Sequence, residues 1–178
     1  AWEAARRGPA RHVHITAPAG LGKTRLMQDA RARLRAGGAR AVYVRANPGE
    51  RHIASAFAGD VAAAVARLPG AAGVTPTIAA TLVALNPALS SVYAATPERR
   101  GGEDALRSRG IALAELFLAV AFEAPLCLLL DDLHWADPQS RQILNGALGR
   151  IGSGKILVVS AARPSADPVS AAEGMSEL

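Results

Sequence analysis

The fold of this chain is decided by residues 12–36, which read HVHITAPAGLGKTRLMQDARARLRA. The segment begins as a short apolar strand at His12–Thr16, crosses a loop rich in glycine and proline, and continues as a helix from about Thr24 to Ala36. A glycine loop between a strand and a helix can wrap around an anion, because its backbone N–H groups point inward and the helix N-terminus adds positive potential. The segment therefore predicts a phosphate-binding loop.

The loop matches most of the pattern G-x-x-x-x-G-K-[ST], with Ala17 at the first glycine position. Gly20 and Gly22 allow the backbone to approach a phosphate closely. In this pattern Lys23 reaches the β- and γ-phosphates of a nucleotide, and the Thr24 hydroxyl is a ligand of Mg²⁺. The predicted nucleotide-binding residues are Ala17, Pro18, Ala19, Gly20, Leu21, Gly22, Lys23, Thr24 and Arg25.

Helical and strand patterns alternate along the rest of the chain. Strands are expected at 41–45, 126–130 and 155–160, and helices at 53–68, 103–123 and from Asp137-Pro138 to about 151. The helix after the loop should bury Leu26, Ala30 and Leu34, and Ile53 should lie on the buried face of the next helix. Alternation of this kind predicts an α/β fold, with a parallel sheet covered by helices on both faces.

The order of the patterns divides the chain into three parts. Residues 12–165 form the expected core, flanked by an N-terminal segment at 1–11 and a C-terminal tail at 166–178. Within the core, residues 70–102 are an irregular insertion or a helical segment, with a short helix near 78–85.

A second candidate site lies at residues 128–133, which read LLLDDL. A carboxylate at the carboxyl end of a buried parallel strand faces the crevice where α/β sheets bind ligands. Asp131 is therefore expected to hold Mg²⁺, and Asp132 to orient or deprotonate the attacking water. The alternative is that these acids only cap the strand end.

Three further residues follow this site in the sequence, and two of them can be interpreted in more than one way. Asp137 is expected to cap the following helix. His134 either approaches the γ-phosphate or is an exposed loop residue. Arg163 follows the last strand, where its charge could sense the γ-phosphate, and otherwise it is a surface arginine.

Composition narrows the remaining choices. The chain has 178 residues, a formal net charge of +5 and one cysteine, so an internal disulfide and a cysteine zinc site are excluded. Cys127 lies in an apolar strand and is expected to be buried. Direct nucleic-acid binding is not favoured, because no aromatic platform accompanies the scattered arginines. The sequence has no membrane-spanning run and no signal peptide at its start, which favours the cytoplasm.

The motifs at residues 17–26, APAGLGKTRL, and 128–137, LLLDDLHWAD, resemble the STAND class of P-loop ATPases. The similarity covers about residues 10–165 and includes the SAARP segment at 160–164. More narrowly, the chain resembles the AAA-type ATPase modules of bacterial LuxR-type regulators and of multidomain adenylate cyclases and kinases.

This resemblance implies a three-layer P-loop NTPase core with strand order 5-1-4-3-2. It implies that ATP and ADP, with Mg²⁺, switch the protein between closed and open forms, often with self-association. Lys23 and Thr24 would bind phosphate and Mg²⁺, Asp131 would bind Mg²⁺, Asp132 would replace a catalytic glutamate, and Arg163 would match a sensor arginine.

The sequence also lacks segments that such proteins carry. No Gly-Arg-x-x-Glu segment precedes the loop, and the chain is too short for a helical lid and a winged helix. The fifth strand is expected to be missing, and the chain to be a piece of a larger protein with weak nucleotide binding and slow turnover.

Three functions follow from these observations. The first is a nucleotide-dependent signalling switch with weak ATPase activity, acting with other domains of a parent chain. The second is an AAA+-like remodelling ATPase with rapid turnover. The third is a scaffold that has lost nucleotide chemistry.

Overall fold

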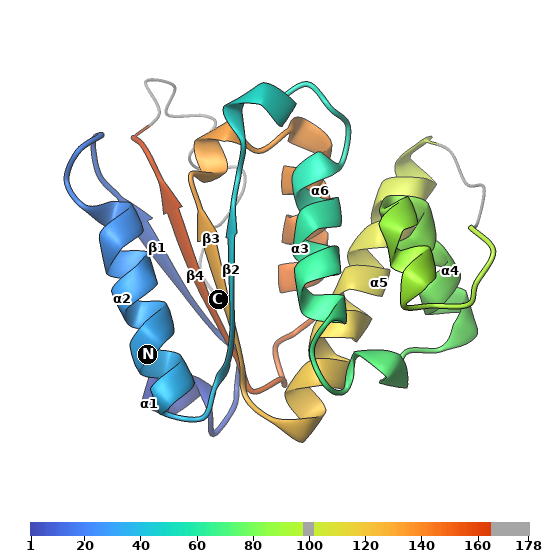
Figure 1. Cartoon of the computed structure of the whole chain (residues 1–178), viewed down its shortest axis with the longest axis horizontal. Coiled ribbons are helices and arrows are strands. Elements are labelled where there is room, and N and C mark those ends of the chain that lie inside the picture. The colour runs from blue at the N-terminus through green and yellow to red at the C-terminus, as the bar shows by residue number, and fades with distance from the viewer. Residues whose placement is uncertain (98–101, 165–178) are drawn as a thin grey trace.

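The computed structural model of the chain describes residues 1–97 and 102–164 (Figure 1). Its centre is a parallel sheet of β1 (Arg11–Thr16), β2 (Arg40–Arg45), β3 (Leu126–Asp131) and β4 (Ile156–Ala162), in the order β1-β4-β3-β2. The predicted α/β fold is confirmed. The strand order is the expected one without its fifth strand, since no further strand occurs among the described residues.

Helices cover both faces of the sheet (Figure 1). They are α1 (Trp2–Ala5), α2 (Lys23–Ala36), α3 (Ala56–Ala66), α4 (Pro76–Leu85), α5 (Gly102–Glu123) and α6 (Pro138–Leu148), with short 3-10 turns η1 (Pro48–Glu50), η2 (Ala71–Gly73), η3 (Pro87–Ser91) and η4 (Leu133–Trp135). Helices α1 and α2 lie on one face, and α3, α5 and α6 lie on the other. Helix α4 packs on α5, farther from the sheet.

Strand β3 is the centre of two hydrophobic cores. All six of its residues are buried, as expected for a central parallel strand. Leu126, Leu128 and Leu130 belong to the larger core under α3, α5 and α6. Cys127 and Leu129 belong to the smaller core under α1 and α2. This alternation fixes which side chains of β3 face α2.

The buried stripe of α2 differs from the predicted one. Leu26 is 54% exposed, whereas Met27 is completely buried. The helix begins at Lys23, and the residues that it buries are Lys23, Met27 and Leu34. The spacing of four and then seven residues keeps these side chains on one face of a helix with 3.6 residues per turn. The prediction for Leu34 is confirmed, and the one for Leu26 is wrong.

Helix α3 begins three residues later than predicted. Ser55 precedes it with a φ of 63°, a left-handed conformation that ends the helical hydrogen-bond pattern on its N-terminal side. Ile53 consequently lies outside the helix and is 56% exposed, so its predicted burial is wrong.

Two segments with weak sequence patterns form helices. Residues 76–85 form α4, which opens with Pro76 after the Thr75 N-cap and overlaps the short helix expected near 78–85. In the N-terminal segment, α1 packs against β1 and β4, and Ala5 is completely buried. The expected tail at 166–178 lies outside the described residues. In the described part of the chain, no helix has the length and apolar character to cross a membrane.

Candidate phosphate-binding site

The glycine loop has the backbone geometry expected of an anion-binding loop. Gly20 and Gly22 have φ values of 82° and 80°, in the left-handed region that favours glycine. From residue 19 to residue 25, no backbone N–H donates a hydrogen bond to another described residue. Ala17 is not among the described residues with positive φ, so a side chain at this position causes no backbone strain.

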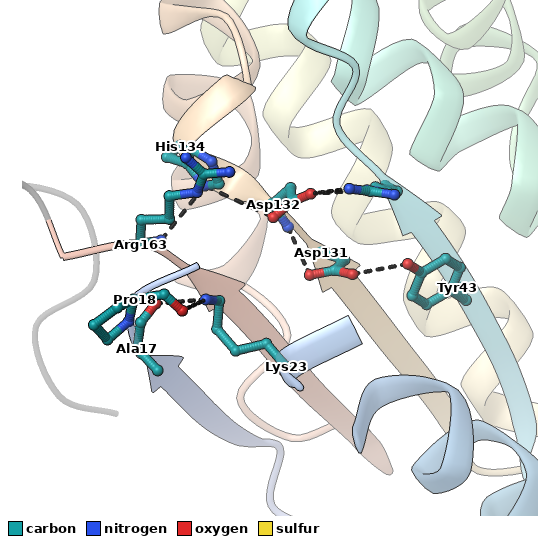
Figure 2. Close-up of polar contacts among 9 residues, drawn as sticks. Ala17, Pro18, Lys23, Tyr43, Asp131, Asp132, His134 and Arg163 are labelled. Carbon is teal, nitrogen blue, oxygen red and sulfur yellow. Dashed lines mark hydrogen bonds and ion pairs between the residues drawn. The ribbon is translucent and has the colours of Figure 1, made fainter. Parts of the chain in front are cut away.

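Lys23 opens α2, and its side chain folds back over the loop. Its ammonium group donates hydrogen bonds to the carbonyl oxygens of Ala17 and Pro18, the second at 2.7 Å (Figure 2). To bind a phosphate, Lys23 must exchange these two contacts for the anion's oxygens. Thr24 lies beside it in the first turn of α2 and is partly buried.

Asp131 ends β3 on the face of the sheet that α2 covers, two residues after Leu129 of the smaller core. Its carboxylate has no exposed surface. The Tyr43 hydroxyl donates to Asp131 Oδ2 at 2.8 Å, and the backbone N–H of Asp132 donates to Oδ1 at 2.9 Å (Figure 2). These two donors stabilise a charge that burial alone would disfavour.

Asp132 adopts the left-handed conformation with a φ of 54°, which is uncommon for a residue other than glycine. Its carboxylate pairs with Arg45 at the end of β2. Arg45 Nε and Nη2 both lie 2.7 Å from Asp132 Oδ2. Non-glycine residues with positive φ gather at functional sites, where the surrounding structure holds them in place.

Arg163 and the turn η4 meet at the same edge of the sheet. The backbone N–H of Arg163 lies 3.4 Å from His134 Nδ1, and its guanidinium lies 6.0 Å from the centre of the Trp135 ring. Arg51 lies at the same distance from that ring. Figure 2 shows Lys23, Asp131 and Arg163 at one edge of the sheet.

Burial and neighbouring charges change two pKa values in the site. Burial raises the pKa of Tyr43, and its hydrogen bond to Asp131 raises it further, so the hydroxyl stays a donor at neutral pH. Burial lowers the pKa of His134, and Arg163 and Lys23 lower it further, although Asp132 acts in the opposite direction. His134 is therefore neutral at neutral pH.

The donor set fits a magnesium ion. Each oxygen of Asp131 accepts one hydrogen bond and keeps further acceptor capacity, and Thr24 adds a hydroxyl oxygen. Mg²⁺ prefers oxygen ligands and usually keeps several waters, so one carboxylate and one hydroxyl suffice beside phosphate oxygens. In the described part of the chain, no group of three or more His, Cys, Asp or Glu side chains gathers to hold another metal.

Other predicted residues have structural or exposed positions. Asp137 is buried, caps α6 by accepting from Ser140 N at 2.9 Å, and also accepts from Ser55 N at 2.8 Å, so the predicted capping role is confirmed. Arg25 is exposed and lies 4.0 Å from Asp29. Pro18, Ala19, Gly20 and Leu21 are exposed in the loop. Cys127 is completely buried, as expected.

Two residues of the site were missed at the sequence level. Tyr43 and Arg45 lie on β2, and Arg45 pairs in register with Asp131. A signal for Arg45 was available, because a basic residue ends a strand that neighbours β3 in the expected strand order. The carboxyl ends of parallel strands meet at one edge, so opposite charges there should pair.

The comparison with protein families agrees with this geometry. The sequence profile of a family described as AAA ATPase domain matches residues 1–159. The chain belongs to this AAA ATPase domain family. The match includes the glycine loop and Asp131, and it ends inside β4, before Arg163.

One curated relative of this AAA ATPase domain is an uncharacterized protein of Rhizobium meliloti (strain 1021). The two are 30% identical over 177 residues, which covers 92% of this chain and 17% of that protein. The chain thus spans less than a fifth of its relative's length. No solved structure matches the chain.

Proposed function

We propose that this AAA ATPase domain binds ATP and ADP with Mg²⁺ and acts as a nucleotide-dependent switch in a larger regulatory protein. One observation carries the proposal: the glycine loop with Lys23 and the acidic end of β3 with Asp131 lie at the same edge of the sheet (Figure 2). A loop rich in unpaired N–H groups can bind phosphates, and a neighbouring carboxylate can hold the accompanying cation.

Each side chain of the site has its own role in ATP hydrolysis. Lys23 and Arg163 neutralise charge on the β- and γ-phosphate oxygens, and Asp132 accepts a proton from the water that attacks the γ-phosphorus. Thr24 and Asp131 would hold Mg²⁺, which would supply further positive charge in the site. The products are ADP and inorganic phosphate.

The pairing of Asp132 supports slow turnover, and hence a switch rather than a remodelling motor. Both guanidinium nitrogens that face Asp132 lie 2.7 Å from one of its oxygens. While Arg45 is in place, this oxygen has little acceptor capacity left for the proton of an attacking water. Other domains of a parent chain and self-association are the partners that we propose, which accords with the much longer relative.

Nucleotide-dependent thermal stability tests the proposal. ATP or ADP with Mg²⁺ at about 100 times its dissociation constant should add about 2.7 kcal/mol of stability to the wild type, and Lys23→Ala should lose this gain. No gain for the wild type with either nucleotide would leave a scaffold as the remaining function. Rapid steady-state hydrolysis that Asp132→Asn abolishes would favour the remodelling ATPase.

A further inference from the structure

His134 links the end of β3 to the end of β4. It lies in η4, and its Nδ1 is 3.4 Å from the backbone N–H of Arg163 and 4.0 Å from Asp132 Oδ1. An imidazole nitrogen that accepts an N–H has no proton of its own, so the proton of the neutral ring is on Nε2. The orientation of the ring therefore makes Nε2–H a donor.

This donor has no acceptor in the described part of the chain. His134 Nε2 is shielded from solvent and makes no hydrogen bond to a described residue. Buried polar groups are nearly always paired, so an unpaired one in a native fold calls for an explanation such as a missing ion or ligand. Lys23 and Arg163 lie close enough to act on the His134 ring electrostatically. An anion that approaches these two cations could also accept from Nε2–H.

Trp135 contacts both His134 and Arg163. Its ring lies 5.0 Å from the His134 ring and 6.0 Å from the Arg163 guanidinium, centre to centre for the rings. A guanidinium over an indole gains cation–π attraction, so Trp135 helps to hold Arg163. The backbone and the side chain of Arg163 are thus both held by consecutive residues of η4.

We propose that His134 reads the γ-phosphate: its Nε2–H donates to a γ-phosphate oxygen of ATP while its Nδ1 accepts the backbone N–H of Arg163. The inference rests on the proposed function and assigns it one more binding residue. ADP lacks the acceptor, so only ATP satisfies the buried donor and fixes the ring. Arg163, which follows β4, would thereby be held differently in the two nucleotide states.

Two substitutions test the roles of the two His134 ring nitrogens separately. His134→Asn keeps an acceptor near the Nδ1 position but removes the distal donor. His134→Gln keeps a donor near the Nε2 position. Hydrogen bonds to a charged acceptor contribute more than neutral ones, so His134→Asn should weaken Mg²⁺–ATPγS binding about tenfold and leave Mg²⁺–ADP binding nearly unchanged. His134→Gln should retain most of the preference for ATPγS.

Titration calorimetry of the whole chain with both nucleotides measures this effect, with Lys23→Ala as the reference for lost phosphate binding. Equal affinities of wild type and His134→Asn for ATPγS, or equal losses for ATPγS and ADP, would overturn the inference while the proposed function stands. If the wild type binds neither nucleotide, both fall.

Trp135 fluorescence gives a second readout that does not depend on affinity. The chain has two tryptophans, so Trp2→Phe leaves Trp135 as its sole indole. In this background, saturating ATPγS should change the emission more than saturating ADP does, and His134→Asn should remove the difference. The same emission with both nucleotides in the Trp2→Phe protein would count against a ring that only ATP fixes.

Discussion

The carboxyl ends of β1 and β3 lie at one edge of the sheet, on either side of β4, yet their polar groups are paired to opposite extents. After β1, the backbone N–H groups of residues 19–25 donate to no described residue. After β3, the chain itself supplies donors to both acids: Tyr43 and a backbone N–H to Asp131, and Arg45 to Asp132. The loop after β1 is thus the open half of the candidate site, and the acidic end of β3 is the half that is braced by the chain's own donors.

The difference has a simple electrostatic origin. An unpaired N–H in an exposed loop can donate to water, so leaving it open costs little. A carboxylate with no exposed surface, such as Asp131, cannot bond to bulk water and needs donors from the protein. We therefore expect substitutions in the loop to affect ligand binding, and substitutions around the acids to affect folding.

The largest effect should come from Gly22→Val in the open half. A β-branched side chain at a φ of 80° costs about 1–3 kcal/mol, so the loop should leave this conformation and nucleotide affinity should fall about 5- to 150-fold. Isothermal titration measures the affinity. Gly152→Val is the matched control, because a Cβ would find open space at both glycines but only Gly22 has a positive φ. Equal affinities of the two variants would contradict the prediction.

Tyr43→Phe tests the braced half. It removes the donor to a buried carboxylate, and we expect a loss of about 2 kcal/mol in the free energy of unfolding, measured in urea. Tyr93→Phe is the control, since its hydroxyl donates to a neutral acceptor, Ala71 O, at 3.0 Å. That variant should lose about 1 kcal/mol. A larger loss for Tyr93→Phe would show that Asp131 does not depend on Tyr43.

A third test concerns the contacts between β1 and β4 inside the sheet. His12 and His14 each lie 2.8 Å from the hydroxyl of Ser160, and burial, with a smaller effect of His14, lowers the pKa of His12 to about 4. In the unfolded chain His12 takes up a proton near pH 6.5, whereas in the folded chain it stays neutral until the pH approaches 4. The contribution of neutral His12 to the free energy of unfolding is therefore complete above pH 6.5 and is lost as the pH falls toward 4.

Between about pH 7 and pH 5, the wild type should therefore lose on the order of 1 kcal/mol more stability than His12→Gln. Urea unfolding of both proteins at the two pH values gives this difference directly. Parallel stability curves would mean that His12 titrates normally in the fold.

The smallest effect is expected for Arg45→Gln. The side chain of Arg45 is 59% exposed, and an exposed ion pair contributes less than about 1 kcal/mol to stability, with a further decrease at high salt. Arg40→Gln should cost more. Arg40 is 18% exposed and bonds to Glu123 and to the carbonyl oxygens of Pro69 and Val120. If Arg45→Gln proves the more destabilising, Asp132 needs its partner for folding.

Much of this arrangement could be predicted from the sequence. The glycine loop, the apolar strand before Asp131 and the alternation of helices and strands are local patterns. A parallel sheet brings the carboxyl ends of its strands to one edge, so these patterns alone predict that Lys23 and Asp131 lie together. The Asp137-Pro138 helix start is equally local, and it is confirmed.

What could not be predicted depends on contacts between distant elements. Leu26 and Met27 are both apolar and adjacent, and only the packing of α2 on the sheet decides which is buried. The positive φ of Ser55 coincides with contacts to α6, since Asp137 accepts its N–H. The Tyr43 contact requires the register of β2 against β3, which hydrophobic patterns do not specify.

The buried thiol of the central strand offers a practical consequence. Cys127 has no exposed surface, and burial raises its pKa to about 12, so almost no reactive thiolate exists at neutral pH. A maleimide dye should leave it unmodified in the native fold. A second cysteine at the 90% exposed Phe122 could be labelled selectively, without first removing the native one. The domain could thus carry one fluorescent label at a chosen surface position while its core residues stay unchanged.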